Sequence, residues 1–335
     1  MAKKAGAGQM GLAVILVAVC NSVVAHAKGP LDETTELAPF IAQMGDAGLD
    51  ESEVRRILAE ARVLPEVIEA ISRPAEAKPW YAYRPIFLTE TRIAKGVEFW
   101  KSEQETLARA EEVYGVPAEV IVAIIGVETL YGERTGRIRV LDSLVTLGFR
   151  YPRRSEFFRS ELRHFLLLTH DEGLNPLAVK GSYAGAMGVP QFISSSYRNY
   201  AIDFDDDGRR DLISSKADAI GSIANYLQRH GWQRGGEIAI AAEVAEEGYK
   251  DVLSRGLKPT MKLRELLSMG VRVYEDVDPD SLVALIELEQ ENSAEHWVVL
   301  NNFYAITRYN HSELYAMAVT QLAREIRDRY QSESK

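Results

Sequence analysis

The sequence has few residues that could build a metal centre or a disulfide. It contains one cysteine, Cys20, which cannot form an intramolecular disulfide and supplies no cysteine cluster for zinc. Its six histidines include no H-E-x-x-H pair. The sequence therefore predicts that no cofactor takes part in catalysis.

Basic residues are also scarce compared with acidic ones. The 335 residues include 39 lysines and arginines and 49 aspartates and glutamates, a formal net charge of −10. Phosphate backbones are bound by clustered positive charge, so this balance argues against nucleic acid as a partner. The composition, 46% hydrophobic and 26% charged, is that of a globular chain, and the length suggests about two domains.

Long apolar runs are absent except near the N-terminus. Lys3 and Lys4 precede the apolar run Met10–Cys20, which is too short to span a bilayer, and Ala25-His26-Ala27 fits a small-x-small cleavage site. These features predict a secretory signal peptide over residues 1–27 and a soluble periplasmic protein.

Cys20 supports an alternative cellular location for the protein. A bacterial lipoprotein is cut just before a cysteine that then carries lipid, which would make this an outer-membrane lipoprotein. The residue before Cys20 is Val19, which is bulkier than such sites prefer. Contact with a membrane is expected only if Cys20 is lipidated.

Apolar periodicity predicts a mainly α chain of the α+β class. Helices are expected over about 90–113, 117–131, 153–171, 217–230 and 312–330. The prolines at 74, 79 and 85 favour an extended packed segment over 73–87. The stretches VRVYE, SLVALIELE and HWVVLNN within 259–300 read as strands, which predicts a small β module inserted late in the chain.

One acidic residue ends an unusually apolar helix. Eight uncharged residues separate Glu119 from Glu128, and seven of them are apolar, so the helix is expected to be buried on most faces. Burial and the negative end of the helix dipole both raise a carboxyl pKa. Glu128 is therefore a candidate proton donor, and a structural glutamate is the alternative.

A glycine-rich segment follows, KGSYAGAMGVPQFISSSY (180–197). Its glycines have the wrong spacing for a dinucleotide fingerprint or a P-loop, and they allow close approach of a ligand or a neighbouring helix. Ser182 and Gln191 add neutral hydrogen-bonding groups that suit a sugar. No G-x-S-x-G motif surrounds Ser182, so a nucleophilic serine is not expected.

Six motifs in order resemble the lytic murein transglycosylase B family. They are VETLYG, YPRR, GSYAGAMGVPQF, DAIGSIANYL, HGW and FYAITRYNHSELYAMAV. The resemblance implies a lysozyme-like catalytic core flanked by helical segments and a small inserted β module. It also implies cleavage of the MurNAc–GlcNAc β-1,4 bond of peptidoglycan with formation of 1,6-anhydro-MurNAc.

The family's functional residues carry over by position. The resemblance makes Glu128 the single acid/base. It implies substrate contacts at Ser182, Gln191, Tyr226, Tyr309, Tyr315, Arg153 and Arg154, with the two arginines on the stem-peptide side. The substrate is then the peptidoglycan glycan strand, and proteins of the cell-wall synthesis machinery are further expected partners.

Two other functions remain open at this point. A hydrolytic muramidase would use Glu128 with a second acid, and no second acid stands in a comparably apolar stretch near it. A non-catalytic murein-binding scaffold would keep the tyrosines and arginines but would not need Glu128.

An acidic loop begins like an EF-hand calcium loop. Positions 1, 3 and 5 are Asp203, Asp205 and Asp207. Arg209 at position 7 would offer its backbone carbonyl, but position 12 is Ser214 rather than a glutamate, and Asp218 could complete a longer loop. The resemblance also implies a structural calcium ion here, and a solvated acidic turn without an ion is the alternative.

The resemblance and the patterns together predict five segments. They are a signal peptide at 1–27, an N-terminal helical segment at 28–100, a lysozyme-like catalytic core at 101–240, a small β-containing module at 241–300 and a C-terminal helical segment completing the core at 301–335.

Overall fold

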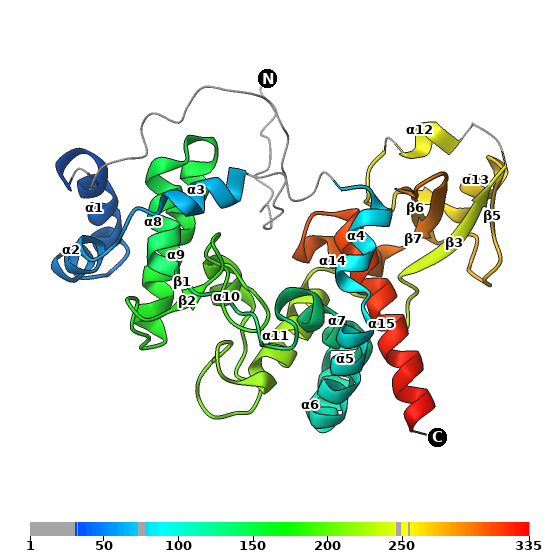
Figure 1. Cartoon of the computed structure of the whole chain (residues 1–335), viewed down its shortest axis with the longest axis horizontal. Helices are drawn as coiled ribbons and strands as arrows, with labels where there is room; N and C mark the ends of the chain where they lie inside the picture. The colour runs from blue at the N-terminus through cyan, green and yellow to red at the C-terminus, as the bar shows by residue number, and fades with distance from the viewer. Residues whose placement is uncertain (1–30, 32, 73–77, 246–248, 254, 335) are drawn as a thin grey trace.

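The computed structural model describes residues 31, 33–72, 78–245, 249–253 and 255–334 (Figure 1). The predicted signal peptide, its cleavage site and Cys20 lie outside these residues. Within the described ranges, no helix has both the length and the apolar character that a membrane crossing requires.

The first helices pack against a helical hairpin from later in the chain, at the left of Figure 1. They are η1 (Glu33–Leu37), α1 (Ala38–Asp46), α2 (Glu51–Ala59) and α3 (Pro65–Ser72). The hairpin consists of α8 (Val140–Arg150), the short turn η2 (Pro152–Arg154) and α9 (Ser155–Asp171). Buried Asp142 of α8 accepts a 2.9 Å hydrogen bond from the Arg62 backbone, which joins the two groups.

Residues 80–87 form helix α4 (Trp80–Phe87), so the prediction of an extended segment is wrong for this described part of 73–87. Pro79 caps the helix start, where its missing N–H costs nothing. Pro85 lies inside the helix, which costs about 3 kcal/mol. Trp80 is fully buried. Burying an aromatic side chain of about 150–250 Å² stabilises the fold by about 4–6 kcal/mol, which is enough to offset the cost of Pro85 in the helix.

Six helices form the centre of the molecule. They are α5 (Glu90–Ser102), α6 (Gln104–Tyr114), α7 (Ala118–Thr129), α11 (Lys216–Arg229), α14 (Asn301–Tyr309) and α15 (Glu313–Glu333). Helix α7 lies at their middle, where α15, α5, α6 and α11 pack against it. Its residues 120–126 are all buried, as the apolar sequence predicts. The predicted helix over 90–113 is divided at Glu103 into α5 and α6.

The glycine-rich segment forms a compact turn between α8–α9 and the central helices. Strand β1 (Ile138–Arg139) pairs antiparallel with β2 (Lys180–Gly181), and helix α10 (Ser194–Tyr200) follows. Isolated bridges join Met187 to Gly181 and to Phe192. A Cβ on Gly136 would lie 2.0 Å from the Gly181 carbonyl oxygen, so the chain can approach this closely only with glycine at 136.

A five-stranded antiparallel sheet lies at the opposite end, at the right of Figure 1. Its strands are β3 (Ala239–Val244), β4 (Met261–Lys262), β5 (Val271–Val273), β6 (Leu282–Glu289) and β7 (Ala294–Val299), in the order β4-β6-β7-β3-β5. Helices α12 (Lys250–Leu253) and α13 (Leu263–Ser268) cover a small core of its own. The predicted mainly α fold with a small inserted β module is confirmed.

Candidate active site

One pocket collects five of the side chains that the sequence singles out. It has a volume of about 200 Å³ and lies between the end of α7, the glycine-rich turn, α11 and α14. The five are Glu128, Ser182, Gln191, Tyr226 and Tyr309. The remaining lining residues are Tyr183, Ala184, Ala186, Phe192, Ile193, Ser196 and Asn310, and Glu128 is the only acid among the described residues that line the pocket.

Glu128 sits half-buried on the last turn of α7 and faces this pocket. The Tyr315 hydroxyl donates a 2.6 Å hydrogen bond to its Oε1. Burial raises the pKa of Glu128 from 4.5 to about 7, and this outweighs the hydrogen bond from Tyr315, which lowers the pKa. A carboxyl group with such a pKa can both give and take a proton near neutral pH.

Helix α7 ends at Thr129, two residues earlier than its sequence predicts. Leu130 and Tyr131 have left-handed backbone angles, with φ values of 51° and 62°, and Gly132 follows with φ of 90°. The Thr129 hydroxyl donates to the Val189 carbonyl at 3.1 Å and accepts from the Gly132 amide at 3.0 Å. The end of the helix that carries Glu128 is thereby joined to the glycine-rich turn.

Ser182 and Gln191 each keep one polar group for a ligand. The Ser182 Oγ accepts hydrogen bonds from the amides of Ala184 (3.3 Å) and Ala186 (3.0 Å), so the hydroxyl retains its own proton to donate. The Gln191 Nε2 uses both hydrogens on the carbonyls of Thr135 and Gly188. Its Oε1 is the acceptor that remains for a sugar hydroxyl.

The tyrosines present rings rather than hydroxyls to the pocket. Tyr226 donates to the Arg308 carbonyl and Tyr309 to the Pro190 carbonyl, each at 2.5 Å. Their ring centroids lie 5.0 Å apart in an edge-to-face arrangement, with an interplanar angle of 65°. Tyr315 is 3% exposed and lies behind Glu128, outside the pocket lining. Burial raises the pKa of Tyr309 and Tyr315 well above the usual range, so both phenols stay neutral.

Asn310 is a lining residue that the sequence reading missed. Its buried Oδ1 has no hydrogen-bond partner in the described part of the chain, and an unsatisfied buried acceptor costs about 1–3 kcal/mol. A ligand hydroxyl would satisfy it. The available signal was its position in TRYNHSELY, directly after Tyr309.

Arg153 and Arg154 lie in η2, and neither is among the described residues that line the pocket. The Arg154 guanidinium lies 4.3 Å from the Phe157 ring centroid. Burial lowers the pKa of Arg154, while the nearby charge of Glu161 raises it. Glu161 in turn accepts a 2.9 Å hydrogen bond from the Ser195 amide at the start of α10.

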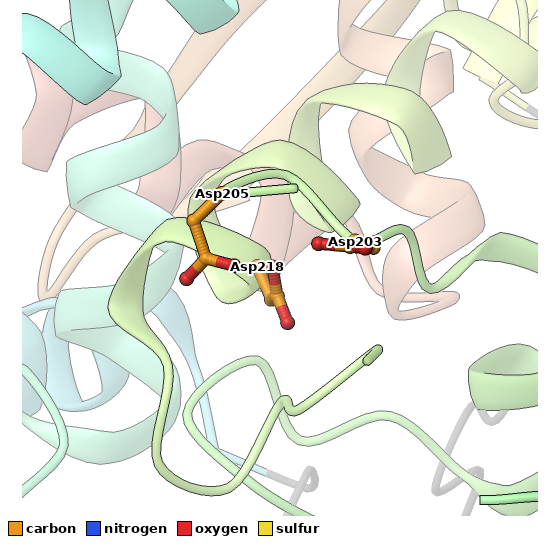
Figure 2. A group of neighbouring side chains, drawn as sticks. All are labelled: Asp203, Asp205 and Asp218. Atoms are coloured by element: carbon orange, nitrogen blue, oxygen red, sulfur yellow. The ribbon is translucent and has the colours of Figure 1, made fainter. Parts of the chain in front are cut away.

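The acidic loop brings three carboxylates together, as Figure 2 shows. Asp203, Asp205 and Asp218 each offer an oxygen within 4.8 Å of the others. Asp207 is outside this group, and its Oδ1 accepts a 2.8 Å hydrogen bond from the Arg209 amide. The structure therefore unites three of the four predicted aspartates.

The same three carboxylates suit a hard cation. Asp218 is fully buried at the start of α11, and its oxygens accept hydrogen bonds from the amides of Phe204 (2.7 Å) and Asp211 (2.6 Å). Burial, followed by the charges of Asp205 and Asp203, raises the pKa of Asp218. Calcium prefers oxygen ligands, and a cation here would relieve the repulsion among the carboxylates.

Comparison with known proteins covers nearly all of the described chain. A family model described as "Transglycosylase SLT domain" matches residues 32–324. The chain is 42% identical over 289 residues to the membrane-bound lytic murein transglycosylase B of Escherichia coli (strain K12), which covers 83% of this chain and 79% of that protein.

Two solved structures are also similar to the chain. Soluble lytic transglycosylase SltB1 from Pseudomonas aeruginosa is 49% identical, with 88% of this chain and 99% of that chain covered and a TM-score of 0.83. Escherichia coli lytic transglycosylase Slt35 in complex with calcium is 41% identical, with 87% and 92% covered and a TM-score of 0.80. These matches confirm the lysozyme-like fold predicted for the catalytic core.

Proposed function

This chain belongs to the transglycosylase SLT domain family and is a peptidoglycan lytic transglycosylase, and we propose that Glu128 is the single acid/base of its reaction. The observation that carries the proposal is the pocket lining. Glu128 is its only acid among the described residues, and its raised pKa suits proton transfer in both directions.

In the first step, the Glu128 carboxylic acid protonates O4 of GlcNAc as the C1–O4 bond to MurNAc breaks. The N-acetyl carbonyl oxygen of MurNAc attacks its own C1 from the opposite face and forms a cyclic oxazolinium. The Ser182 hydroxyl, which retains its proton, orients this N-acetyl group by donating a hydrogen bond.

In the second step, the Glu128 carboxylate takes the proton from the C6 hydroxyl of MurNAc. The C6 oxygen attacks C1, displaces the N-acetyl oxygen and closes the 1,6-anhydro ring. Glu128 returns to its acid form, and no water is consumed. The aromatic faces of Tyr226 and Tyr309 contact the sugar rings, and Gln191 and Asn310 accept hydrogen bonds from sugar hydroxyls.

The competing muramidase reaction needs a second carboxylate to activate water or to form a covalent intermediate. Glu133, the acid closest to Glu128 in sequence, pairs with Lys95 instead of lining the pocket. This favours the transglycosylase reaction, in which the substrate supplies the second group.

Digestion of purified sacculi followed by mass analysis of the products tests the proposal. We expect anhydromuropeptides, whose ends are lighter by one water than the reducing ends that hydrolysis leaves. Reducing ends as the main product would contradict the single-acid mechanism and favour the muramidase. Binding of sacculi without any soluble product would favour the murein-binding scaffold.

We propose that Asp203, Asp205 and Asp218 hold a structural calcium ion. The three clustered carboxylates support this, as does the calcium complex of the relative Slt35. Asp207 and the Arg209 carbonyl complete the proposed loop, as the EF-hand spacing predicts. The ion would fix the loop before α11, the helix that carries Tyr226, and it takes no part in the bond cleavage.

We also propose contacts to the stem peptide through Arg153 and Arg154, which lie beside α9 near the start of α10. Guanidinium groups pair well with peptide carboxylates. The Arg153→Ala and Arg154→Ala variants should lose rate on peptide-bearing glycan while keeping it on glycan stripped of peptide. An equal loss on both substrates would contradict the peptide contact.

The relatives include a protein named membrane-bound and a protein named soluble. We propose that this chain is soluble in the periplasm after cleavage behind Ala27, and the lipoprotein form at Cys20 is the alternative. Mass spectrometry of the mature N-terminus distinguishes them, because a chain that starts at Lys28 retains no cysteine.

A further inference from the structure

The chain turn directly after Glu128 is backbone-strained. Leu130 and Tyr131 both occupy the left-handed region, which residues with a Cβ rarely adopt, and Gly132 adopts it as well. Hydrogen bonds from the Leu130 amide to Gly126 and from the Tyr131 amide to Ile125 close the end of α7. Such strain persists only where the surroundings hold it.

Tyr131 supplies contacts that hold this turn. Its ring folds back over α7, and its hydroxyl donates a 2.8 Å hydrogen bond to the Arg92 carbonyl of α5. The ring also packs against Phe99 of α5, with centroids 5.7 Å apart. Tyr131 therefore connects the end of α7 to α5.

Two glycines make room for the Tyr131 side chain. A Cβ on Gly126 of α7 would lie 2.5 Å from the Tyr131 hydroxyl oxygen, and a Cβ on Gly96 of α5 would lie 2.7 Å from it. At both positions a Cβ fits only if a neighbour shifts, namely Tyr131 at Gly126, and Tyr131 and Ile326 at Gly96. The hydroxyl is thus lodged between the two helices at a place where each has only backbone.

Arg92 closes the same group of contacts from the other side. Its Nε donates a 3.0 Å hydrogen bond to the Gly126 carbonyl, and its Nη1 donates to the carbonyls of Ile86 and Phe87 at the end of α4. The Gly126 carbonyl is therefore held by Arg92, while the Gly126 Cα is covered by Tyr131. We call Arg92, Gly96, Gly126 and Tyr131 the α5–α7 clamp.

Helix geometry relates the clamp to the pocket. Successive residues of an α-helix are about 100° apart around the axis, so Gly126 and Glu128 lie about 200° apart, on opposite faces. The clamp residues contact the face of α7 that is turned toward α5. The opposite face of α7 carries Glu128, which lines the pocket and accepts the hydrogen bond from Tyr315. Movement of one face moves the other, because α7 is packed on all sides.

We propose that Tyr131 is a positioning residue for the reaction: through the α5–α7 clamp it fixes the end of α7 and with it the place of the Glu128 carboxyl. This inference rests on the proposed role of Glu128. Tyr131 itself is not among the described residues that line the pocket.

Gly126→Ala is the sharpest test, because its Cβ would displace the Tyr131 hydroxyl. We expect kcat to fall by on the order of tenfold to a hundredfold, since a shift of about 1 Å at a reacting group has this cost. KM should change much less, because the sugar-binding residues of the pocket are untouched. The pH at which kcat/KM is halved should move below about 7, because a displaced carboxyl gains water.

A double-variant cycle separates positioning from general damage. In a Tyr131→Ala background the space beside Gly126 is empty, so adding Gly126→Ala should lower kcat no further. Gly148→Ala in α8 is the matched control, because the nearest atoms to its Cβ would belong to Arg159 and no described residue of α8 lines the pocket. Tyr131→Phe, which keeps the ring, should show a weaker form of the Gly126→Ala effect.

The cycle has two outcomes that overturn the proposal. One is that Gly126→Ala and Tyr131→Phe keep kcat within about twofold of the parent and keep the parent's pH profile. The other is that kcat falls together with Tm while the pH profile is unchanged. A merely structural role of Tyr131 would give this result. If Glu128→Gln retains activity, the proposed function fails instead, so the two failures are distinguishable.

Discussion

The pKa values of two carboxyl groups in this molecule, Glu128 and Asp218, are both raised, but the two groups have different neighbours. Both are partly or fully buried, and burial is the largest cause that raises the pKa of each. Around Glu128 the close groups are neutral, namely the Tyr315 hydroxyl and the polar lining of the pocket. Around Asp218 they include two further carboxylates, Asp203 and Asp205.

The difference in neighbours decides the chemistry. A lone carboxyl among neutral groups holds or releases a proton at little cost near its raised pKa, which suits acid/base catalysis. Three carboxylates that share one place repel each other, and a cation relieves the repulsion of all three together. The same residue class thus serves proton transfer in the pocket and ion binding in the loop.

The largest expected effect separates the two sites by activity. Glu128→Gln should lower the rate of anhydromuropeptide release by about 10²–10⁴-fold, because an amide cannot donate the proton to O4. Asp205→Asn, at the other site, should lower it far less. Release rates from purified sacculi measure both, with circular dichroism to confirm the fold. A near-normal rate for Glu128→Gln would show that Glu128 is not the catalytic acid, and the contrast with the ion-binding carboxylates would then be wrong.

The next effect concerns pH. The first step needs protonated Glu128, and the protonated fraction falls as pH rises through a pKa of about 7. We therefore expect kcat/KM to be level below that pH and to fall about tenfold per pH unit above it. Rates on a soluble glycan between pH 5 and about pH 9 give the profile. A level profile across this range would show that Glu128 is not the titrating acid.

A smaller effect concerns calcium and stability. At a calcium concentration of about 100 times Kd, binding should raise the free energy of unfolding by about 2.7 kcal/mol. Asp205→Asn should remove most of this gain, because one of three clustered carboxylates is lost. Thermal unfolding in EDTA and in calcium measures it.

Asp206→Asn is the matched control for the calcium experiment. Asp206 is exposed and lies outside the three-carboxylate group, and asparagine tolerates its left-handed φ of 60°. The variant should keep the calcium response. If the parent protein itself melts at the same temperature in EDTA and in calcium, the loop is a solvated acidic turn.

The smallest effect concerns Tyr315. Its hydrogen bond lowers the pKa of Glu128, so Tyr315→Phe should raise that pKa and move the falling limb of the kcat/KM profile to higher pH. Tyr309→Phe is the comparison, because the Tyr309 hydroxyl donates to the Pro190 carbonyl and its loss should leave the limb in place. A limb that moves down in Tyr315→Phe would contradict this account.

Local patterns predicted most of the elements, and their failures have identifiable causes. The apolar run of α7 and the strands β5, β6 and β7 follow from periodicity and composition, which act over neighbouring residues. Helix α4 was missed because the proline rule is local, whereas the burial of Trp80 that offsets it comes from contacts with distant parts of the chain. The end of α7 was misplaced because Leu130 and Tyr131 adopt left-handed angles that only tertiary contacts maintain.

The candidate site shows the same division. Glu128, Ser182 and Gln191 stand out in their own segments, because an acid in an apolar run and polar groups among glycines are unusual locally. Asn310 does not stand out, and its importance comes from lining the pocket with an unpartnered oxygen. Arg153 and Arg154 are predicted to lie on the stem-peptide side, and their position outside the described lining of the pocket is a placement that no local pattern reveals.

By itself, the sequence determined the chemical inventory: one acid in a helix apolar enough to be buried, no cysteine or histidine cluster for a metal, and an acidic loop with calcium-like spacing. Only the tertiary structure decided that the acid has a single pocket with neutral neighbours, which aspartates meet and which do not, and how Tyr131 holds the end of α7. The reason is that burial and proximity depend on segments far apart in the chain, and these two quantities set the pKa of a carboxyl group.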